Sequence, residues 1–340
     1  MIRTIRTGRS CTRWRAPGMI VGAALMLASC GGESIAPDDS SSASVPTQAP
    51  RQSAIAPGIP VGPIGLWTMD KLEWGPGPFT ASQNAIHPDT LIKQINAARA
   101  KGHRLIMAMT PGPSPRYVTN GQFDMAKWKK AMDGYNKPTL KTAVAAAVAD
   151  GTIIGNLMID EPETVRWGNT LTKAKLDQMA VYVKAIFPTL LVGVNHGPPG
   201  YKWRSTEHYT KLDYVLYQYA HWVTNGNLTS WKTAVLAQAK ADGVKPVFSL
   251  NVLNGGKQDR GDGLYDCIGT DMGGLGTRYP NCTMTPTQVR SWGKTLAPLG
   301  CAMLFWNFNK PYFSNAANLS AMTDVATLAK SQPRPSCKRP

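Results

Sequence analysis

The chain has 340 residues, enough for two average domains or for one large α/β domain of about 250 residues. Hydrophobic residues make up 43% and charged residues 17%, so the chain can bury a substantial core and is not globally disordered. The formal net charge is +16, but beyond the N-terminal segment the basic residues form no block that would grip phosphates, so we expect no nucleic-acid partner.

The first thirty residues have the pattern of a secretory signal peptide. Five arginines and no acidic residue precede a short apolar run, which ends in small residues. This is the only long apolar run, and it is too short for a stable bilayer span, so a polytopic membrane protein is excluded. The ending, Leu27-Ala28-Ser29-Cys30, resembles the bacterial lipobox, in which cleavage occurs before a cysteine that is then acylated. An ordinary signal peptide and a mitochondrial presequence are the alternatives.

The lipobox resemblance implies a lipoprotein signal peptide over residues 1–29, lipidation of Cys30 and a bilayer as partner. It also implies a lipid-anchored location in the bacterial cell envelope. Gly31, and not aspartate, follows the cysteine, which by the rule known for some bacteria permits transport to the outer membrane. Residues 30–60 are rich in glycine, serine and proline and predict a flexible tether that holds the following domain off the membrane.

Residues 61–340 predict one domain in which short apolar runs alternate with amphipathic helices. The predicted strands cover residues 64–69, 104–109, 152–159, 190–195, 214–219, 246–252 and 302–308, with an eighth hidden between Trp74 and Ile86. The predicted helices cover residues 88–100, 172–187, 229–242, 285–296 and 319–330. Such alternation favours parallel strands with right-handed crossovers, and hence a (β/α)8 barrel. A doubly wound sheet is the alternative, but no glycine-rich phosphate loop follows the first predicted strand.

Four cysteines lie beyond the predicted cleavage site and the lipidated Cys30, and export favours their oxidation. Three pairings are possible, and we favour Cys267–Cys282, closing a loop rich in glycine and aspartate, and Cys301–Cys337, fixing the C-terminal tail. Zinc binding is the competing interpretation, but no C-x₂-C or H-x₃-H spacing occurs. We therefore expect disulfides, no metal and no cofactor.

A (β/α)8 barrel builds its site from the loops that follow its strands, so residues just past each predicted strand are the candidates for substrate binding. Carboxylates, amides, rings and one imidazole occur there: Asp70, Glu73, Trp74, Asp160, Glu161, His196, Gln218, Tyr219, Asn251, Asn254, Trp306 and Asn307. Rings stack on sugar faces, while amides and carboxylates bind hydroxyl groups. The set predicts a carbohydrate ligand.

One strand end, Ile159-Asp160-Glu161-Pro162, resembles the Asn-Glu-Pro that ends strand four in the superfamily of retaining glycoside hydrolases with (β/α)8 barrels. Trp306 on the final strand is similar to the aromatic floor of their first sugar subsite. The resemblance implies that Glu161 is the general acid/base, with Asp160 where the family has asparagine. The chain departs from the family at strand seven, which should supply a second carboxylate but has none over residues 248–254. Other candidates for that carboxylate are Asp70, Glu73, Asp259 and Asp262.

Three functions fit this pattern. The first is an envelope-anchored glycoside-hydrolase-like protein that acts on a poly- or oligosaccharide with Glu161 as general acid/base. The second is a non-catalytic glycan-binding or surface lipoprotein on a barrel scaffold, which the missing second acid favours. The third is a metal-dependent hydrolase that uses Asp160, Glu161 and His196. The acidic pair could also have a structural role, in which it caps the next helix or pairs with Arg166.

Overall fold

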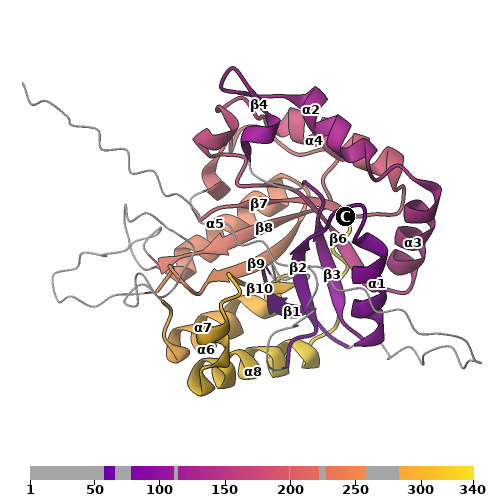
Figure 1. Cartoon of the computed structure of the whole chain (residues 1–340). Coiled ribbons are helices and arrows are strands. Elements are labelled where there is room, and N and C mark those ends of the chain that lie inside the picture. The colour runs from indigo at the N-terminus through magenta and orange to yellow at the C-terminus, as the bar shows by residue number, and fades with distance from the viewer. Residues whose placement is uncertain (1–56, 66–77, 111–113, 199, 222–226, 257–282) are drawn as a thin grey trace, which may run out of the picture. The chain divides into compact units, whose positions relative to one another are not determined.

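The computed structural model describes residues 57–65, 78–110, 114–198, 200–221, 227–256 and 283–340 (Figure 1). Its main sheet has eight parallel strands, in the order β1-β10-β9-β8-β7-β6-β3-β2. The strands are β1 Val61–Pro63, β2 Ala81–Ala85, β3 Arg104–Ala108, β6 Ile153–Asp160, β7 Val192–His196, β8 Tyr214–Tyr219, β9 Lys245–Asn251 and β10 Met303–Trp306.

The two outer strands of this order meet, so the sheet closes on itself. Ile64 forms a parallel bridge with Gln83, and the Thr80 N–H donates to the Val61 carbonyl at 2.8 Å. A closed ring of eight parallel strands confirms the predicted (β/α)8 barrel and the predicted hidden strand, which is β2. Closure leaves none of these strands with an unpaired edge.

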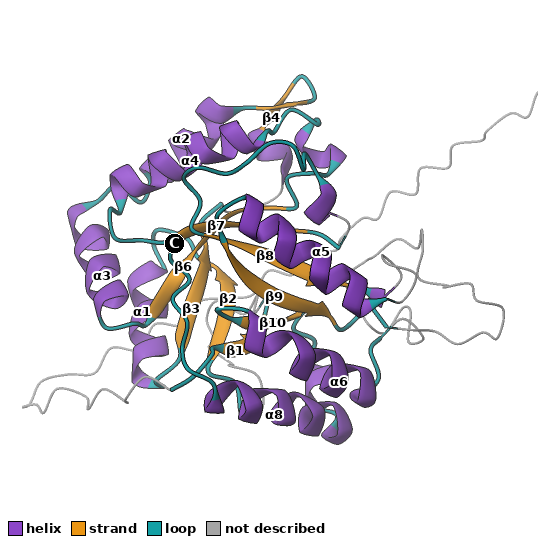
Figure 2. Ribbon diagram, turned by 180° about the vertical axis from the view of Figure 1, so that it is seen from behind, coloured by secondary structure: helices purple, strands orange, loops and turns teal. Residues whose placement is uncertain are grey.

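Helices surround the barrel, as Figure 2 shows. They are α1 Leu91–Ala100, α2 Met125–Asp133, α3 Pro138–Ala149, α4 Lys173–Ile186, α5 Leu228–Ala241, α6 Pro286–Leu296, α7 Lys310–Ser314 and α8 Ala316–Ser331. Shorter elements are η1 Ser114–Tyr117, the hairpin of β4 Val118–Thr119 and β5 Gln122–Phe123, η2 Val165–Trp167, η3 Gly200–Lys202 and η6 Ala297–Leu299. The five predicted helices are present. Thr285 and Gln288 form a capping box at the start of α6.

The first strand lies earlier than the sequence predicts, at Val61–Pro63 where residues 64–69 were expected. Prolines 60 and 63 resemble the tether that precedes them, which hid the strand. Gly62 is needed in β1 because a Cβ there would lie 1.6 Å from the Ala81 carbonyl oxygen of β2. The remainder of the expected strand, residues 66–69, lies outside the described residues.

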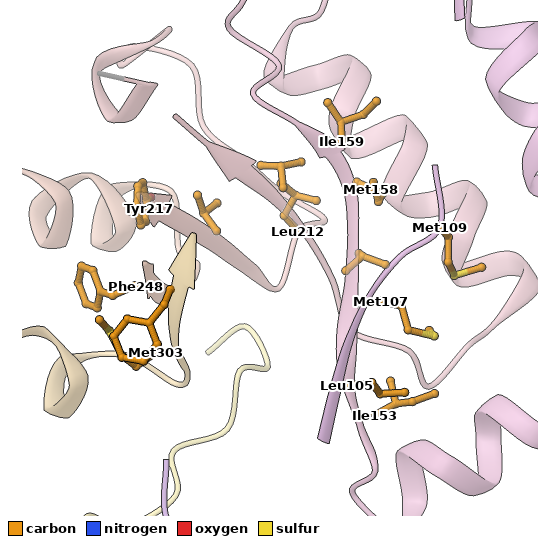
Figure 3. Packing of buried hydrophobic residues seen from close by; sticks show 14 of the residues in the cluster. Leu105, Met107, Met109, Ile153, Met158, Ile159, Leu212, Tyr217, Phe248 and Met303 are labelled. Carbon is orange, nitrogen blue, oxygen red and sulfur yellow. The ribbon is translucent and has the colours of Figure 1, made fainter. Parts of the chain in front are cut away.

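The core has two layers, one inside the barrel and one between the strands and the helices. On β8, Tyr214 and Leu216 point into the barrel, whereas Val215, Tyr217 and Tyr219 belong to the outer layer. Figure 3 shows part of this outer layer. Alternation of inward and outward side chains along each strand decides which residues reach the mouth of the barrel.

The C-terminal tail is fixed to the barrel by the predicted disulfide between Cys301 and Cys337, which are 36 residues apart. A loop of this size is expected to stabilise the fold by roughly 2–4 kcal/mol. The predicted Cys267–Cys282 pair lies outside the described residues. Within the described part of the chain, no helix is both long and apolar enough to span a bilayer.

Candidate active site

A cavity of about 390 Å³ lies at the carboxyl ends of the barrel strands. Its polar and aromatic walls come from several parts of the barrel and include Gln83 of β2, Asp160 of β6, Arg166 and Trp167 of η2, Asn195 of β7, and Trp306 and Asn307 at the end of β10. This is the end at which (β/α)8 barrels place their active sites. The cavity is therefore the candidate active site.

Asp160 and Glu161 stand at the point where β6 turns away from the barrel. Asp160 is the last residue of the strand, and Glu161 has a φ of 46°, a left-handed conformation that is uncommon for a residue with a side chain. Backbone bonds fix this turn: the Glu161 N–H donates to the Asn195 carbonyl at 2.8 Å, and the Glu161 carbonyl accepts from the Thr164 N–H at 3.1 Å. Strained backbone held in this way is typical of functional sites.

Arg166 joins the two carboxylates. Its Nη2 donates to Asp160 Oδ2 at 2.9 Å and to Glu161 Oε2 at 2.7 Å. Because both oxygens contact one nitrogen, they lie at most about 6 Å apart, so the two acids share one cation. The other Asp160 oxygen accepts from the Asn195 Nδ2 at 2.5 Å. The pairing with Arg166 that the sequence allowed is thus present, and it brings both acids to one place.

The two carboxylates differ in their surroundings. The Asp160 side chain is 61% exposed and the Glu161 side chain is 26% exposed. Burial raises the pKa of Glu161 to about 7, and the negative charges of Asp160 and Glu163 act in the same direction, while Arg166 opposes them. A carboxyl group that keeps its proton near neutral pH, next to a second acid, is the arrangement a general acid requires.

Glu163 ties the loop after β7 to the Glu161 turn. Its Oε1 accepts from the Gly197 N–H at 2.6 Å, and its Oε2 lies 3.0 Å from the His196 Nδ1. The Tyr209 hydroxyl lies 3.0 Å from the other ring nitrogen of His196. A Cβ on Gly197 would lie 2.8 Å from Glu161 Oε1, so a side chain at this position would require the Glu161 side chain to shift.

The structure places the predicted site residues in different surroundings. Asp160, Trp306 and Asn307 line the cavity. Glu161 does not line it but contacts Arg166, which does. His196 is 2% exposed and packs outside the barrel against Tyr217, with ring centroids 6.0 Å apart. The other described candidates are buried and do not line the cavity: Gln218, Tyr219, Asn251 and Asn254.

Those buried candidates have internal partners. The Asn251 Nδ2 donates to Gln218 at 3.3 Å, and the Asn254 N–H donates to Asn251 Oδ1 at 3.1 Å. Tyr219 packs edge-on against Trp231 and Trp292. The remaining candidates lie outside the described residues: Asp70, Glu73, Trp74, Asp259 and Asp262.

Sequence reasoning did not select Gln83 or Arg166 as site residues. Gln83 lies on the strand whose limits the sequence did not reveal. Arg166 comes from a short 3₁₀ helix, η2, that carries no periodic signal. The one available clue was that Arg166 closely follows the acidic pair in the sequence.

The described residues contain no group of three or more His, Cys, Asp or Glu side chains that could hold one metal ion. At the end of β9, where the glycoside hydrolases of the resemblance carry their second acid, this chain has Asn251. Among the described acids, Asp160 and Glu163 are the ones that act on Glu161.

Comparison with known proteins gives matches among solved structures alone. No protein-family model matches the chain, and no curated protein matches it. An endo-1,4-beta-mannanase from Rhizomucor miehei is 13% identical, with 82% of this chain and 98% of that chain covered and a TM-score of 0.47. Xylanase 10B from Thermotoga maritima is 11% identical, with 79% of this chain and 95% of that chain covered and a TM-score of 0.46. A GH39 beta-xylosidase from Caulobacter crescentus is 12% identical, with 75% of this chain and 64% of that chain covered and a TM-score of 0.44. The barrel fold of this chain is established independently, by its strand order and closure.

Proposed function

We propose that the protein is a glycoside hydrolase of the cell envelope that acts on a poly- or oligosaccharide. The observation that carries this proposal is the pair of carboxylates, Asp160 and Glu161, which are held by Arg166, a residue of the strand-end cavity. Trp306 supplies an aromatic wall for a sugar ring, and the amides of Gln83, Asn195 and Asn307 supply partners for hydroxyl groups.

Glu161 acts in this proposal as the general acid. With a pKa of about 7 it is protonated in about half of the molecules at neutral pH, and this protonated form delivers its proton to the glycosidic oxygen as the bond to the anomeric carbon breaks. The Asp160 carboxylate, held by Arg166 and the Asn195 amide, stabilises the positive charge that develops on the sugar. Asp70, Glu73, Asp259 and Asp262 stay candidates for a nucleophile or base.

A glycan-binding protein without hydrolytic activity is the second candidate function. It is favoured by Asn251, which stands at the end of β9 and is hydrogen-bonded to Gln218. A barrel with the aromatic and amide walls described above binds sugars whether or not a second acid completes the reaction. The two candidates share a ligand and differ in turnover.

The decisive experiment measures binding and cleavage on the same glycans. We expect at least one polysaccharide from a panel of plant and bacterial glycans to bind and to release reducing ends over time. Asp160→Asn should retain binding and lose most of this release. Glu207→Asp, at a described acid that does not line the cavity, is the control. A glycan that binds while its cleavage is undetectable would establish the binding protein instead.

Envelope anchoring forms a separate part of the proposal, and the lipobox-like Leu27–Cys30 supports it. We expect Cys30→Ala to abolish incorporation of labelled fatty acid and to leave a precursor or a soluble product, because the acylated sulfur is gone. The measurement is acyl labelling in a bacterial host, followed by membrane fractionation. Cys11→Ala, in the same segment, is the control. Labelling that persists unchanged in Cys30→Ala would contradict the anchor.

A further inference from the structure

We propose that the amino-terminal end of the barrel, opposite the cavity, is a docking face for an anionic phospholipid bilayer. This basic face consists of Lys101, Lys330, Arg334 and Lys338, all of them exposed. The inference goes beyond the proposed hydrolase, and it concerns the folded domain, separately from any acyl chain on Cys30.

The C-terminal tail and the first described residues converge on this face. The tail is tied down by the disulfide to Cys301 and by the Arg339 guanidinium, which donates to the Tyr209 carbonyl at 2.9 Å and to the Leu212 carbonyl at 3.3 Å. These partners all precede barrel strands, at the amino-terminal end. The Ile59 N–H donates to the Ala329 carbonyl at 2.9 Å, next to Lys330. The chain that carries the predicted lipid site therefore joins the domain at the basic face.

Several cations of this region lie close enough to influence one another. Burial and then the charge of Lys101, with a smaller effect of Lys330, lower the pKa of His103. Burial and the charge of Arg334 lower the pKa of Arg104 to about 10. Like charges gathered in this way repel one another, and they are relieved when an anionic surface approaches.

Within the part of the chain that the structure describes, no carboxylate forms a salt bridge with Lys330, Arg334 or Lys338. The exposed Asp150 is occupied by Arg99, at 2.7 Å. Lys330 also complements the dipole of α8, since it lies in the last turn of that helix. The helix dipole does not account for Arg334 and Lys338, because both lie in the tail and in no helix. Their charges are left for a partner.

A bilayer fits this face better than a narrow ligand does. The cations are spread over a helix end, a loop and the tail, as a flat anionic surface requires, and each Lys or Arg near such a surface contributes to attraction. Leu299 of η6, which packs against α8, is 39% exposed and offers an apolar side chain at the same end. Docking here leaves the cavity, at the opposite end of the strands, open to a polymer.

Vesicle binding tests the proposal. The full chain with Cys30→Ala is mixed with vesicles of phosphatidylcholine, or of phosphatidylcholine with about one third phosphatidylglycerol, and bound protein is measured by flotation. We expect binding to the anionic vesicles, weakened by added salt. Lys330→Gln/Lys338→Gln should weaken it by about tenfold or more. Lys137→Gln/Lys310→Gln removes the same charge from two other exposed lysines, which follow strands β3 and β10, and should change binding little.

Three results would overturn the docking face. The first is equal binding to both kinds of vesicle, and the second is an equal loss in both double variants, because either would show that no local surface is involved. The third is binding of an acidic polysaccharide through Lys330 and Lys338 in the absence of vesicle binding, which would assign the face to a glycan. Thermal unfolding of both variants confirms that they are folded. Hydrolytic activity does not enter any of these outcomes.

Discussion

Replacing Glu161 with glutamine is expected to lower turnover by about 10²–10⁴-fold on glycosides with poor leaving groups. Glutamine keeps the size and much of the hydrogen bonding of Glu161 but has no proton to give. Folding and ligand affinity should therefore change little. Glycosides with very good leaving groups should be affected less, because their departure needs little protonation. The measurement is kcat for a series of aryl glycosides of increasing leaving-group pKa.

Glu207→Gln is the matched control for this experiment, because Glu207 pairs with Arg204 and does not line the cavity. The single variants Asp70→Asn, Glu73→Gln, Asp259→Asn and Asp262→Asn then locate a second carboxylate. If Glu161→Gln retained the full rate on every substrate, the proposal of a hydrolase would stand, but Glu161 would not be its general acid.

Removing the positive charge of Arg166 is expected to shift the alkaline limb of the pH–activity profile to higher pH, by about one pH unit or more. In the unchanged protein, Glu161 loses its proton as the pH rises through about 7, and activity should fall there. Arg166 is the cation that opposes this elevation, so in Arg166→Gln the pKa of Glu161 rises further. The measurement is kcat/KM against pH. Arg290→Gln, which breaks the Arg290–Asp324 pair away from the cavity, should leave the limb in place.

The same protonation has a consequence for stability. The folded-state pKa of Glu161, about 7, lies above the ordinary value of 4.5, so the folded protein binds this proton more tightly than the unfolded chain does. The contribution is fully present below about pH 4.5 and is lost as the pH rises through about 7. Glu161→Gln should remove this decline in the free energy of unfolding.

For the activity prediction, an alkaline limb that stays at the same pH in Arg166→Gln would show that another group controls activity.

The sequence determined most of the barrel because its signals are local. Runs such as residues 214–219 are apolar and rich in β-forming side chains, and here the strand bounds agree with the prediction. The capping box at Thr285 and Gln288 joins residues three positions apart, so it can be read directly. Counting cysteines left three pairings, of which Cys301–Cys337 was favoured because it fixes the C-terminal tail. The same reasoning located the strand end that carries Asp160 and Glu161.

Tertiary structure alone decided which residues around that strand end face the cavity. In a parallel barrel both faces of each strand are buried, so an apolar run does not reveal which alternate positions point inward. His196 and Tyr219 end β7 and β8, and their rings lie in the outer layer, whereas Asn195, one residue before His196, lines the cavity. Closure of β1 on β2 and the reach of Arg166 across the Glu161 turn are contacts between separate segments. Such contacts form when the sheet closes, and no local pattern in the sequence encodes them.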